Sequence, residues 1–414
     1  MTPGAPGRDP EVVLGVGGGI AAYKSAEVIR RLAALGARVT VTPTEAALRF
    51  VGIATFEALS GRAVRTDVFS DVPSVAHVRT GQHADLVVIA PATADLLAKA
   101  AHGIADDMLT ATLLVTRAPV LMAPAMHTEM WYHPATVANV ATLRSRGVIV
   151  LEPAVGRLTG PDSGPGRLPE AEQIVAVAEL LLSRPDALPQ DLVGVRVLIS
   201  AGGTREDLDP VRYLSNRSSG KQGFALAQVG AARGAEVTLV AANSALLTPP
   251  GVTVVPVTDA RALHETMLEL SGNADVVVMA AAVADFRPAL KQTAKIKKVG
   301  DLAPEPLELV RNPDVLVDLV AARRPGQLIV GFAAETGDDR ADYLTYARDK
   351  LARKGCDLLV VNRVDNDRAF DTSDNAVTVL AADSPDPVAD VALGPKSVIA
   401  AAIWDVVSRR MTPR

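Results

Sequence analysis

Short apolar runs alternate with helical patterns along this chain. Val195–Ile199 and Leu86–Ala90 have the character of buried strands, while Ala21–Leu35 and Gly223–Gly230 have helical spacing. Hydrophobic residues make up 49% of the sequence but aromatic residues only 3%, so the cores must consist of Ala, Val, Leu and Ile. Parallel sheets that are buried on both faces suit this composition. The pattern therefore predicts an α/β protein.

Two phrases recur at large separation. ADLVVIAPATAD at residues 84–95 is echoed by ADVVVMAAAVAD at residues 274–285. Common descent of two halves, or convergence on the same α/β pattern, would give the same architecture. We expect two doubly wound parallel-sheet domains, residues 1–190 and 191–414, joined by a proline-containing linker at about 184–191.

Composition and charge exclude several classes of function. The 414 residues carry a net charge of −5 that divides evenly between the halves, which argues against a nucleic-acid partner. The single cysteine, Cys356, excludes an intramolecular disulfide framework and a cysteine-based zinc cluster. No apolar run approaches the roughly 18 residues of a membrane span, and the N-terminus lacks a signal-peptide core. We expect a cytoplasmic protein that binds no membrane.

The segment from Ser200 to Ala227 concentrates glycine, hydroxyl and charged residues between a strand and a helix. An ordinary long connection is the simpler interpretation. However, Asn216, Arg217 and Lys221 stand where an open sheet binds its ligand. The segment therefore predicts a site for phosphate and carboxylate groups.

A second glycine-rich turn, Gly17–Gly19, follows the first strand. A dehydrogenase would carry the spaced-glycine fingerprint and an acidic residue at the end of the next strand, but that strand ends in Thr42, Pro43 and Thr44. Hydroxyl groups suit a phosphate better than a ribose. We therefore disfavour a dinucleotide-dependent dehydrogenase.

These motifs resemble two families that are commonly fused in bacteria. GGGIAAYK at 17–24, APATAD at 90–95 and GIADD at 103–107 resemble flavin-containing cysteine decarboxylases, and residues 200–227 resemble phosphopantothenate–cysteine ligases. The resemblance implies a flavodoxin-like flavoprotein domain followed by a Rossmann-like ligase domain. It implies CTP-dependent joining of 4′-phosphopantothenate to L-cysteine through an acyl-cytidylate, then FMN-dependent decarboxylation to 4′-phosphopantetheine.

The resemblance assigns residues in the first domain. It places Gly18, Gly19 and Thr44 at the flavin phosphate and Thr93 and Asp107 near the ribityl chain and ring. It makes His77 catalytic and assigns substrate binding to Met126, His127 and Arg167.

The first domain also departs from the family pattern. His127 stands where asparagine is usual, so carboxylate binding should strengthen at lower pH. The substrate flap, residues 157–167, lacks the cysteine that many relatives use as a proton donor, and Thr159, His127 and water remain candidates. An alternative function is therefore an active ligase joined to a non-catalytic flavin-binding scaffold.

In the second domain, the resemblance assigns the acyl intermediate to Asn216 and its capture by cysteine to Lys295. Lys295, with Lys297 and Lys298, belongs to a polar loop that we expect to be a mobile cover. Mg²⁺ is implied by the triphosphate, and Asp285 could contact either the metal or the nucleotide. CTP is favoured only because relatives use it, and the family likeness implies trimers of the decarboxylase part joined by dimers of the ligase part. The residues matched to the nucleotide site are Met279, Ala280, Ala281, Asp285, Lys295, Pro313, Asp314, Val315, Leu316, Phe332, Lys350 and Lys354.

Overall fold

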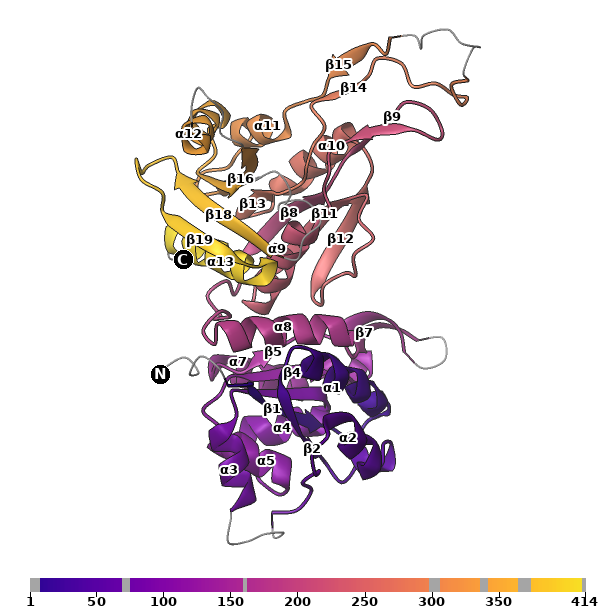
Figure 1. Ribbon diagram of the computed structural model, residues 1–414, viewed down its shortest axis with the longest axis vertical. Helices are drawn as coiled ribbons and strands as arrows, with labels where there is room; N and C mark the ends of the chain where they lie inside the picture. Colours follow the sequence, from indigo (N-terminus) through magenta and orange to yellow (C-terminus); the bar gives the residue numbers. More distant parts are fainter. Residues whose placement is uncertain are drawn as a thin grey trace. The chain divides into compact units, whose positions relative to one another are not determined.

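The computed structural model describes residues 8–68, 75–158, 162–297, 306–335, 342–363 and 374–411. It divides into two compact units, one formed by Met1–Gln190 with Pro249–Gly251 and the other by Asp191–Thr248 with Val252–Arg414 (Figure 1). Each unit is built around a parallel sheet with helices on both faces. The predicted α/β class with two doubly wound sheets is confirmed.

The first unit has a five-stranded parallel sheet in the order β2-β1-β3-β4-β5. This is the flavodoxin order, which confirms the predicted fold. The central strands are buried along their whole length because helices cover both faces. The strands are β1 (Glu11–Val16), β2 (Arg38–Pro43), β3 (Leu86–Ala92), β4 (Val120–Pro124) and β5 (Ile149–Val150), followed by a hairpin of β6 (Ala154–Arg157) and β7 (Ser163–Arg167).

The helices of the first unit form two groups. Helix α1 packs against α2 and α8, whereas α3 packs against α5 and α4 against α7. The helix expected at Ala21–Leu35 begins later than predicted, because its first turn is tightened into a 3-10 turn by a bond from Ala22 N to Gly19 O of 2.9 Å. The helices are η1 (Ile20–Lys24), α1 (Ser25–Ala34), η2 (Ala47–Arg49), α2 (Ile53–Ser60), α3 (Ala76–His83), α4 (Ala94–His102), α5 (Met108–Val115), α6 (Thr128–Trp131), α7 (Pro134–Ser145) and α8 (Ala171–Ser183).

The second unit has an eight-stranded sheet in the order β12-β11-β8-β13-β16-β17-β18-β19. The first six strands are parallel and follow the Rossmann order, in which strands are added on one side of β8 as far as β12 and then on its other side from β13 onward. The last two strands are antiparallel additions. The strands are β8 (Arg196–Gly202), β11 (Glu236–Ala242), β12 (Val252–Val257), β13 (Val276–Met279), β16 (Leu328–Glu335), β17 (Leu358–Arg363), β18 (Asp374–Ala381) and β19 (Ala389–Pro395).

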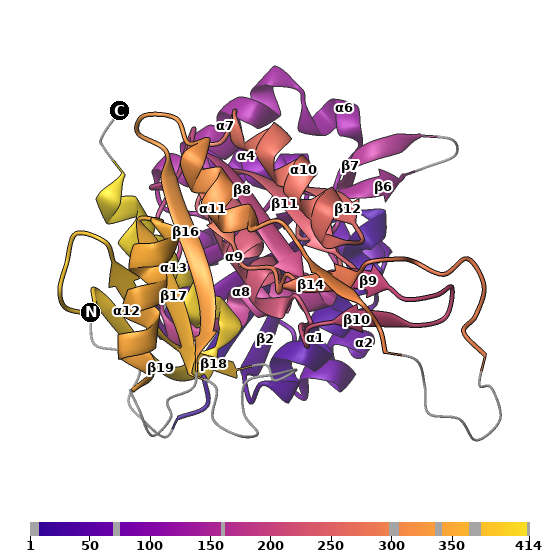
Figure 2. The same ribbon diagram turned by 90° about the horizontal axis from the view of Figure 1, so that it is seen from above.

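Two short antiparallel hairpins interrupt this pattern where the sequence predicts only loops. The first pairs β9 (Arg205–Asp207) with β10 (Tyr213–Ser215), and the second pairs β14 (Phe286–Pro288) with β15 (Leu309–Arg311). Figures 1 and 2 show both hairpins projecting from the sheet of the second unit. The helices are α9 (Lys221–Ala232), α10 (Ala260–Ser271), α11 (Val315–Ala321), α12 (Tyr343–Lys354) and α13 (Lys396–Arg410).

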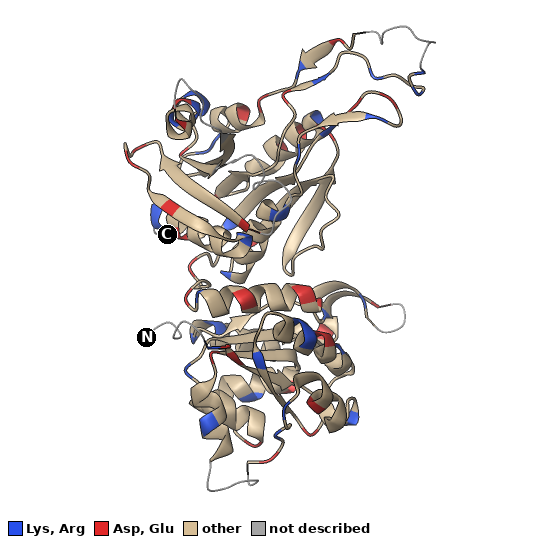
Figure 3. Cartoon of the chain, viewed as in Figure 1, with Lys and Arg blue, Asp and Glu red and all other residues tan. Residues whose placement is uncertain are grey.

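A buried arginine joins the first residue of the second unit to its last helix, α13. Arg233 is 1% exposed, with its Nη2 2.5 Å from Oδ2 of Asp191 and its Nη1 2.8 Å from Oδ1 of Asp405. Other charged residues of both signs are interspersed over both units (Figure 3). In the described part of the chain, no helix combines the length and the apolar character needed to cross a membrane.

Candidate functional site

A cavity of about 1110 Å³ lies at the carboxyl edge of the first unit's sheet. Loops after β1, β2, β3 and β4 form it, together with the β6–β7 hairpin. Nearly all residues predicted for flavin or substrate therefore meet at one place. They are Gly18, Gly19, Thr44, Thr93, Asp107, Met126, His127 and Arg167.

Two glycines of the turn at this cavity, Gly17 and Gly18, have no room for side chains. A Cβ atom on Gly18 would lie 2.3 Å from Cβ of Ala46, and one on Gly17 would lie 2.5 Å from the carbonyl oxygen of Pro91. The turn can therefore approach a ligand only as bare backbone. Ligand cavities commonly enclose about 300–1000 Å³, so this cavity has space for a flavin and its phosphate. The residues present fit that group.

Two polar residues of the cavity wall also begin helices. The Thr93 hydroxyl accepts a hydrogen bond from Leu96 N at 3.3 Å, and the Asp107 carboxylate accepts one from Thr110 N at 2.7 Å. Their positions are explained by capping alone. Capping nevertheless directs the amino ends of α4 and α5 toward the cavity, where the helix dipole favours negatively charged ligand groups.

The β6–β7 hairpin contributes one wall of the cavity. Met126 N donates to Gly166 O at 2.9 Å, and the Thr128 hydroxyl donates to Pro165 O at 2.9 Å. These bonds hold the loop that carries His127 against the strand that carries Arg167. Thr159, a candidate proton donor, lies outside the described residues.

His77 is the predicted residue that does not line this cavity. It lies at the start of α3, which packs against α5. Its Nδ1 atom is buried and has no hydrogen-bond partner within the described chain. The structure thus separates the His77 ring from the cavity of its own chain.

In the second unit, the predicted residues gather at the carboxyl ends of β8 and β13, the two neighbouring strands at which the strand order reverses. The Asn216 amide donates to Val283 O at 3.0 Å, which ties the end of β10 to the segment that follows Ala281. Ala281 N donates to the Ser200 hydroxyl at 3.1 Å. Asn216 and the Met279–Ala281 backbone therefore share one edge of the sheet.

Two further connections bring the start of α11 to this edge. Asn312 N donates to the carbonyl oxygen of the exposed Asp285 at 2.9 Å, and the next residues, Pro313 and Asp314, lead into α11. The Asp314 carboxylate caps α11 and also pairs with Lys354.

The remaining nucleotide-site predictions lie on or beside the same elements. Val315 and Leu316 are buried and pack into the hydrophobic core of the second unit. Phe332 is half-buried on β16, and Lys350 lies one turn before Lys354 on α12.

Lys295 is located differently from the other predicted ligase residues. It is exposed and makes no hydrogen bond or ion pair within the described residues. Its neighbours are fixed to the β9–β10 hairpin: Ile296 N donates to the Asp209 carboxylate in the turn at 3.1 Å, and Lys291 pairs with Asp207 at the end of β9 at 2.6 Å. Lys298 lies outside the described residues.

Asp209 anchors this lysine segment through a buried carboxylate. Burial acts to raise the pKa of the carboxyl, but hydrogen bonds from the N–H groups of Val211, Ile296 and Arg212 outweigh it. The pKa of Asp209 is therefore held below its ordinary value, and the anchor stays charged at neutral pH.

Comparison with known proteins decides the family. A model described as the DNA/pantothenate metabolism flavoprotein C-terminal domain matches residues 192–411, and a Flavoprotein model matches residues 4–182. The coenzyme A biosynthesis bifunctional protein CoaBC of Mycobacterium bovis is 61% identical over 403 residues, which cover 96% of each chain. CoaBC of Vibrio cholerae is 41% identical over 404 residues, 97% of this chain and 98% of its own.

The chain belongs to the CoaBC family. This membership confirms the predicted recognition and enzyme class: the chain is a bifunctional enzyme of coenzyme A biosynthesis, with a ligase half and a flavoprotein decarboxylase half. The match of the first half to the flavoprotein model also supports a flavin cofactor.

The cavity of the first unit also contains charged residues that the sequence did not point to. Lys99 lies 3.0 Å from Asp106 and 3.4 Å from Asp95. The hydrogen bond to Asp106 raises the pKa of Lys99, and the same bond lowers the pKa of Asp106. The four-residue spacing from Asp95 to Lys99 on a helix was the available signal. Lys24, at the end of the glycine-turn motif, was also overlooked, and it pairs with Glu170 at 3.1 Å.

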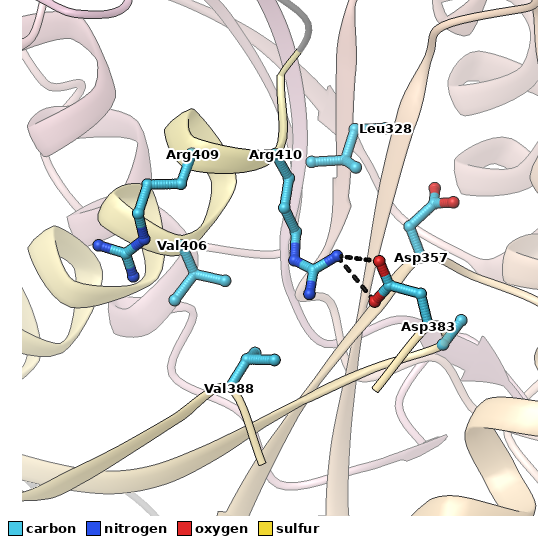
Figure 4. A pocket seen from close by; sticks show the side chains of 8 residues that line it. Leu328, Asp357, Asp383, Val388, Val406, Arg409 and Arg410 are labelled. Carbon is cyan, nitrogen blue, oxygen red and sulfur yellow. Dashed lines mark hydrogen bonds and ion pairs between the residues drawn. The ribbon is translucent and has the colours of Figure 1, made fainter. Parts of the chain in front are cut away.

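Another hollow, of about 600 Å³, lies at the amino edge of the second unit's sheet. In Figure 4 the Arg410 side chain points to both oxygens of Asp383, at 2.9 and 2.8 Å. This amino edge lies opposite the carboxyl edge of the same sheet, where the predicted nucleotide residues gather. We therefore do not assign the ligase chemistry to it.

No group of three or more His, Cys, Asp or Glu residues that could hold a metal occurs in the described ranges. Cys356 is buried, and burial raises the pKa of its thiol to about 11. A thiol with so high a pKa is a poor nucleophile at neutral pH.

Proposed function

We propose that the chain carries out two successive reactions of coenzyme A synthesis. The second unit, residues 191–414, would use CTP to join 4′-phosphopantothenate to L-cysteine. The first, residues 1–190, would use FMN to decarboxylate the product to 4′-phosphopantetheine. The observation that carries this proposal is the cavity in which the flavin and substrate residues assigned from the sequence meet.

In the first unit, the bare backbone of Gly18 and Gly19 and the Thr44 hydroxyl would hold the FMN phosphate. A bound flavin would accept two electrons from the substrate thiol and later return them, which makes loss of the carboxylate possible. His127 follows Met126 and Arg167 follows Gly166, the two residues joined by a backbone hydrogen bond. Their side chains would bind the substrate carboxylate.

We assign the catalytic histidine role to His77, acting on a second copy of the chain. Its ring lies outside the cavity of its own chain and has a buried, unpartnered nitrogen in the described structure. A trimer of the first unit would let this ring complete a neighbour's cavity. The family likeness also implies dimers of the ligase part, so we propose a closed assembly of trimers joined by dimers.

In the second unit, the pantothenate carboxylate would attack the α-phosphorus of CTP and release pyrophosphate. The cysteine amine would then attack the acyl-cytidylate, forming the amide and releasing CMP. Asn216 would orient the acyl group, and Lys295 would approach as its segment moves over the edge.

The nucleotide would lie along the same edge of the sheet. Lys350 and Lys354 would meet phosphate charge, and Mg²⁺ would accompany the triphosphate, with Asp285 as a possible contact. We place the enzyme in the cytoplasm, because its one described cysteine, Cys356, is free and unpaired.

A one-pot assay tests the proposal. Purified protein would be supplied with FMN, Mg²⁺, CTP, 4′-phosphopantothenate and L-cysteine, and products followed by mass spectrometry. We expect 4′-phosphopantetheine and CMP. Accumulation of phosphopantothenoylcysteine alone would support the alternative in which the first unit is a non-catalytic scaffold. A parallel assay replaces CTP by ATP. An equal rate of product formation, with release of AMP, would contradict the choice of CTP.

A further inference from the structure

A second, smaller cavity of the first unit lies at the opposite edge of its sheet from the flavin cavity. It encloses about 210 Å³ near the amino ends of β1 and β2. We call it the amino-edge pocket. Basic side chains from three separate segments line it: Arg8, Arg62, Arg65, Arg79 and His83.

The acidic groups near the amino-edge pocket are already engaged. Glu11, the one carboxylate among the described lining residues, has Oε2 2.6 Å from Nη1 of Arg62 and Oε1 3.2 Å from Nε of Arg38. Arg8 is paired with Asp85 at 2.8 Å. The described carboxylates therefore leave part of the positive charge unmatched.

Two arginines and two hydroxyl groups supply unused donors. The side chains of Arg65 and Arg79 make no hydrogen bond or ion pair to any part of the chain that the structure describes, and neither do the hydroxyls of Thr40 and Thr80. Arg65 follows α2, whereas Arg79 and Thr80 lie on α3. Donors from separate elements thus line one small concavity.

We propose that the amino-edge pocket binds a phosphate or diphosphate group. Guanidinium groups match phosphate oxygens in geometry and charge, and hydroxyls add neutral donors. The cavity is smaller than the roughly 300 Å³ at which sites for whole organic ligands begin, so only the phosphate end of a larger molecule would enter. A bound phosphate would bridge Arg65 to Arg79 and so connect the segment after α2 to α3.

Calorimetric titration of pyrophosphate into the full-length, FMN-loaded protein tests this proposal. Three proteins are compared: wild type, the double variant Arg65→Ala with Arg79→Ala, and the control Arg30→Ala. Arg30 is an exposed arginine on α1 of the same unit. We expect the double variant to lose this site or to bind at least about tenfold more weakly, while the control matches wild type. Pyrophosphate bound at the ligase site contributes equally to all three and cancels.

The same titration with 4′-phosphopantothenate distinguishes the source of the phosphate. Weakening for pyrophosphate alone supports an inorganic ligand, and weakening for both supports the phosphate end of an organic one. Equal isotherms for all three proteins would overturn the proposal. So would an altered oligomer size in sedimentation with unchanged pyrophosphate affinity, because the arginines would then serve an acidic protein surface. Should the double variant fail to bind FMN, Arg65→Ala alone provides the comparison.

Discussion

Two stretches of similar sequence diverge at the carboxyl edges of the two sheets. Residues 84–95 and 274–285 both provide a buried strand, β3 and β13. Even their first acidic residues act alike, since Asp85 and Asp275 each accept a backbone hydrogen bond from the neighbouring strand, at 2.8 and 2.9 Å. Beyond its strand, the first stretch turns into helix α4, whereas the second continues into the projecting β14–β15 hairpin.

One position explains the divergence. Thr93 caps helix α4, whereas Val283 at the equivalent position has no hydroxyl with which to cap one. Ala284 N is taken instead by the Thr204 hydroxyl, at 3.0 Å, which holds the segment extended. At this position the two edges part: the first lines the cavity, and the second leads to the β14–β15 hairpin, the arm that carries Lys295.

The largest expected effect is on the ligase rate, when Lys295 in the arm is replaced. Lys295→Ala should lower the ligase kcat about 10²–10³-fold, because the acyl intermediate would lose a positioned cation. Rates of CMP release and of phosphopantothenoylcysteine formation measure this. Decarboxylation of supplied phosphopantothenoylcysteine should be unchanged. An unaffected ligase rate would show that the arm is not part of the catalytic site.

The enclosed edge should be most sensitive at its glycine turn. Gly18→Ala introduces a Cβ 2.3 Å from that of Ala46, and relieving such overlap costs about 1–3 kcal/mol, which corresponds to about a 5- to 150-fold loss of FMN affinity. Flavin fluorescence titration measures it. Ligase activity serves as the internal control, and retention of wild-type affinity would place the phosphate elsewhere.

The hydroxyl that keeps the second edge extended can be removed with little change of shape. Thr204→Val leaves Ala284 N without its partner, a loss of about 1–3 kcal/mol. At about 2–4 °C per kcal/mol, the second unit should unfold several degrees lower in a calorimetric scan. Thr142→Val, on the exposed face of α7, is the matched control. Equal melting of both variants would refute the importance of this bond.

The smallest expected effect concerns the anchor of the lysine segment. Asp209→Asn should speed trypsin cleavage after Lys295 or Lys297 about fivefold at neutral pH, because the carboxylate that accepts from Ile296 N is lost.

The pH dependence follows from the lowered pKa of Asp209. Its contribution is present above the ordinary carboxyl pKa and is lost only as pH falls through the lowered value. The difference between variant and wild type should therefore persist from pH 8 down to pH 5. Its disappearance within that range would contradict the assignment.

The buried parallel strands could be predicted from the sequence because they are dense apolar runs. The two hairpins could not, since strands such as β9 and β10 are three residues long and largely exposed, with no alternation long enough to detect. Their positions become visible only from pairing, for example Leu214 with Glu206.

The candidate site was predictable where motifs follow strand ends. Gly18, Thr44 and Thr93 all directly follow parallel strands, whose carboxyl ends share an edge. The position of His77 was not predictable, because the sequence around it does not show which way α3 presents its first turn. The spacing from Asp95 to Lys99 indicates only one of the two ion pairs of Lys99, because the pair with Asp106 forms beyond the end of α4.

The link through Arg233 has a consequence for modularity. Its guanidinium contacts Asp191 at the first residue of the second unit and Asp405 in the last helix, so the entry and exit of that unit meet at one side chain. A folding unit whose ends meet can be attached to another chain without rearranging its interior. The ligase half can therefore be joined to another domain through a short linker before Asp191, without change to the contacts inside the unit.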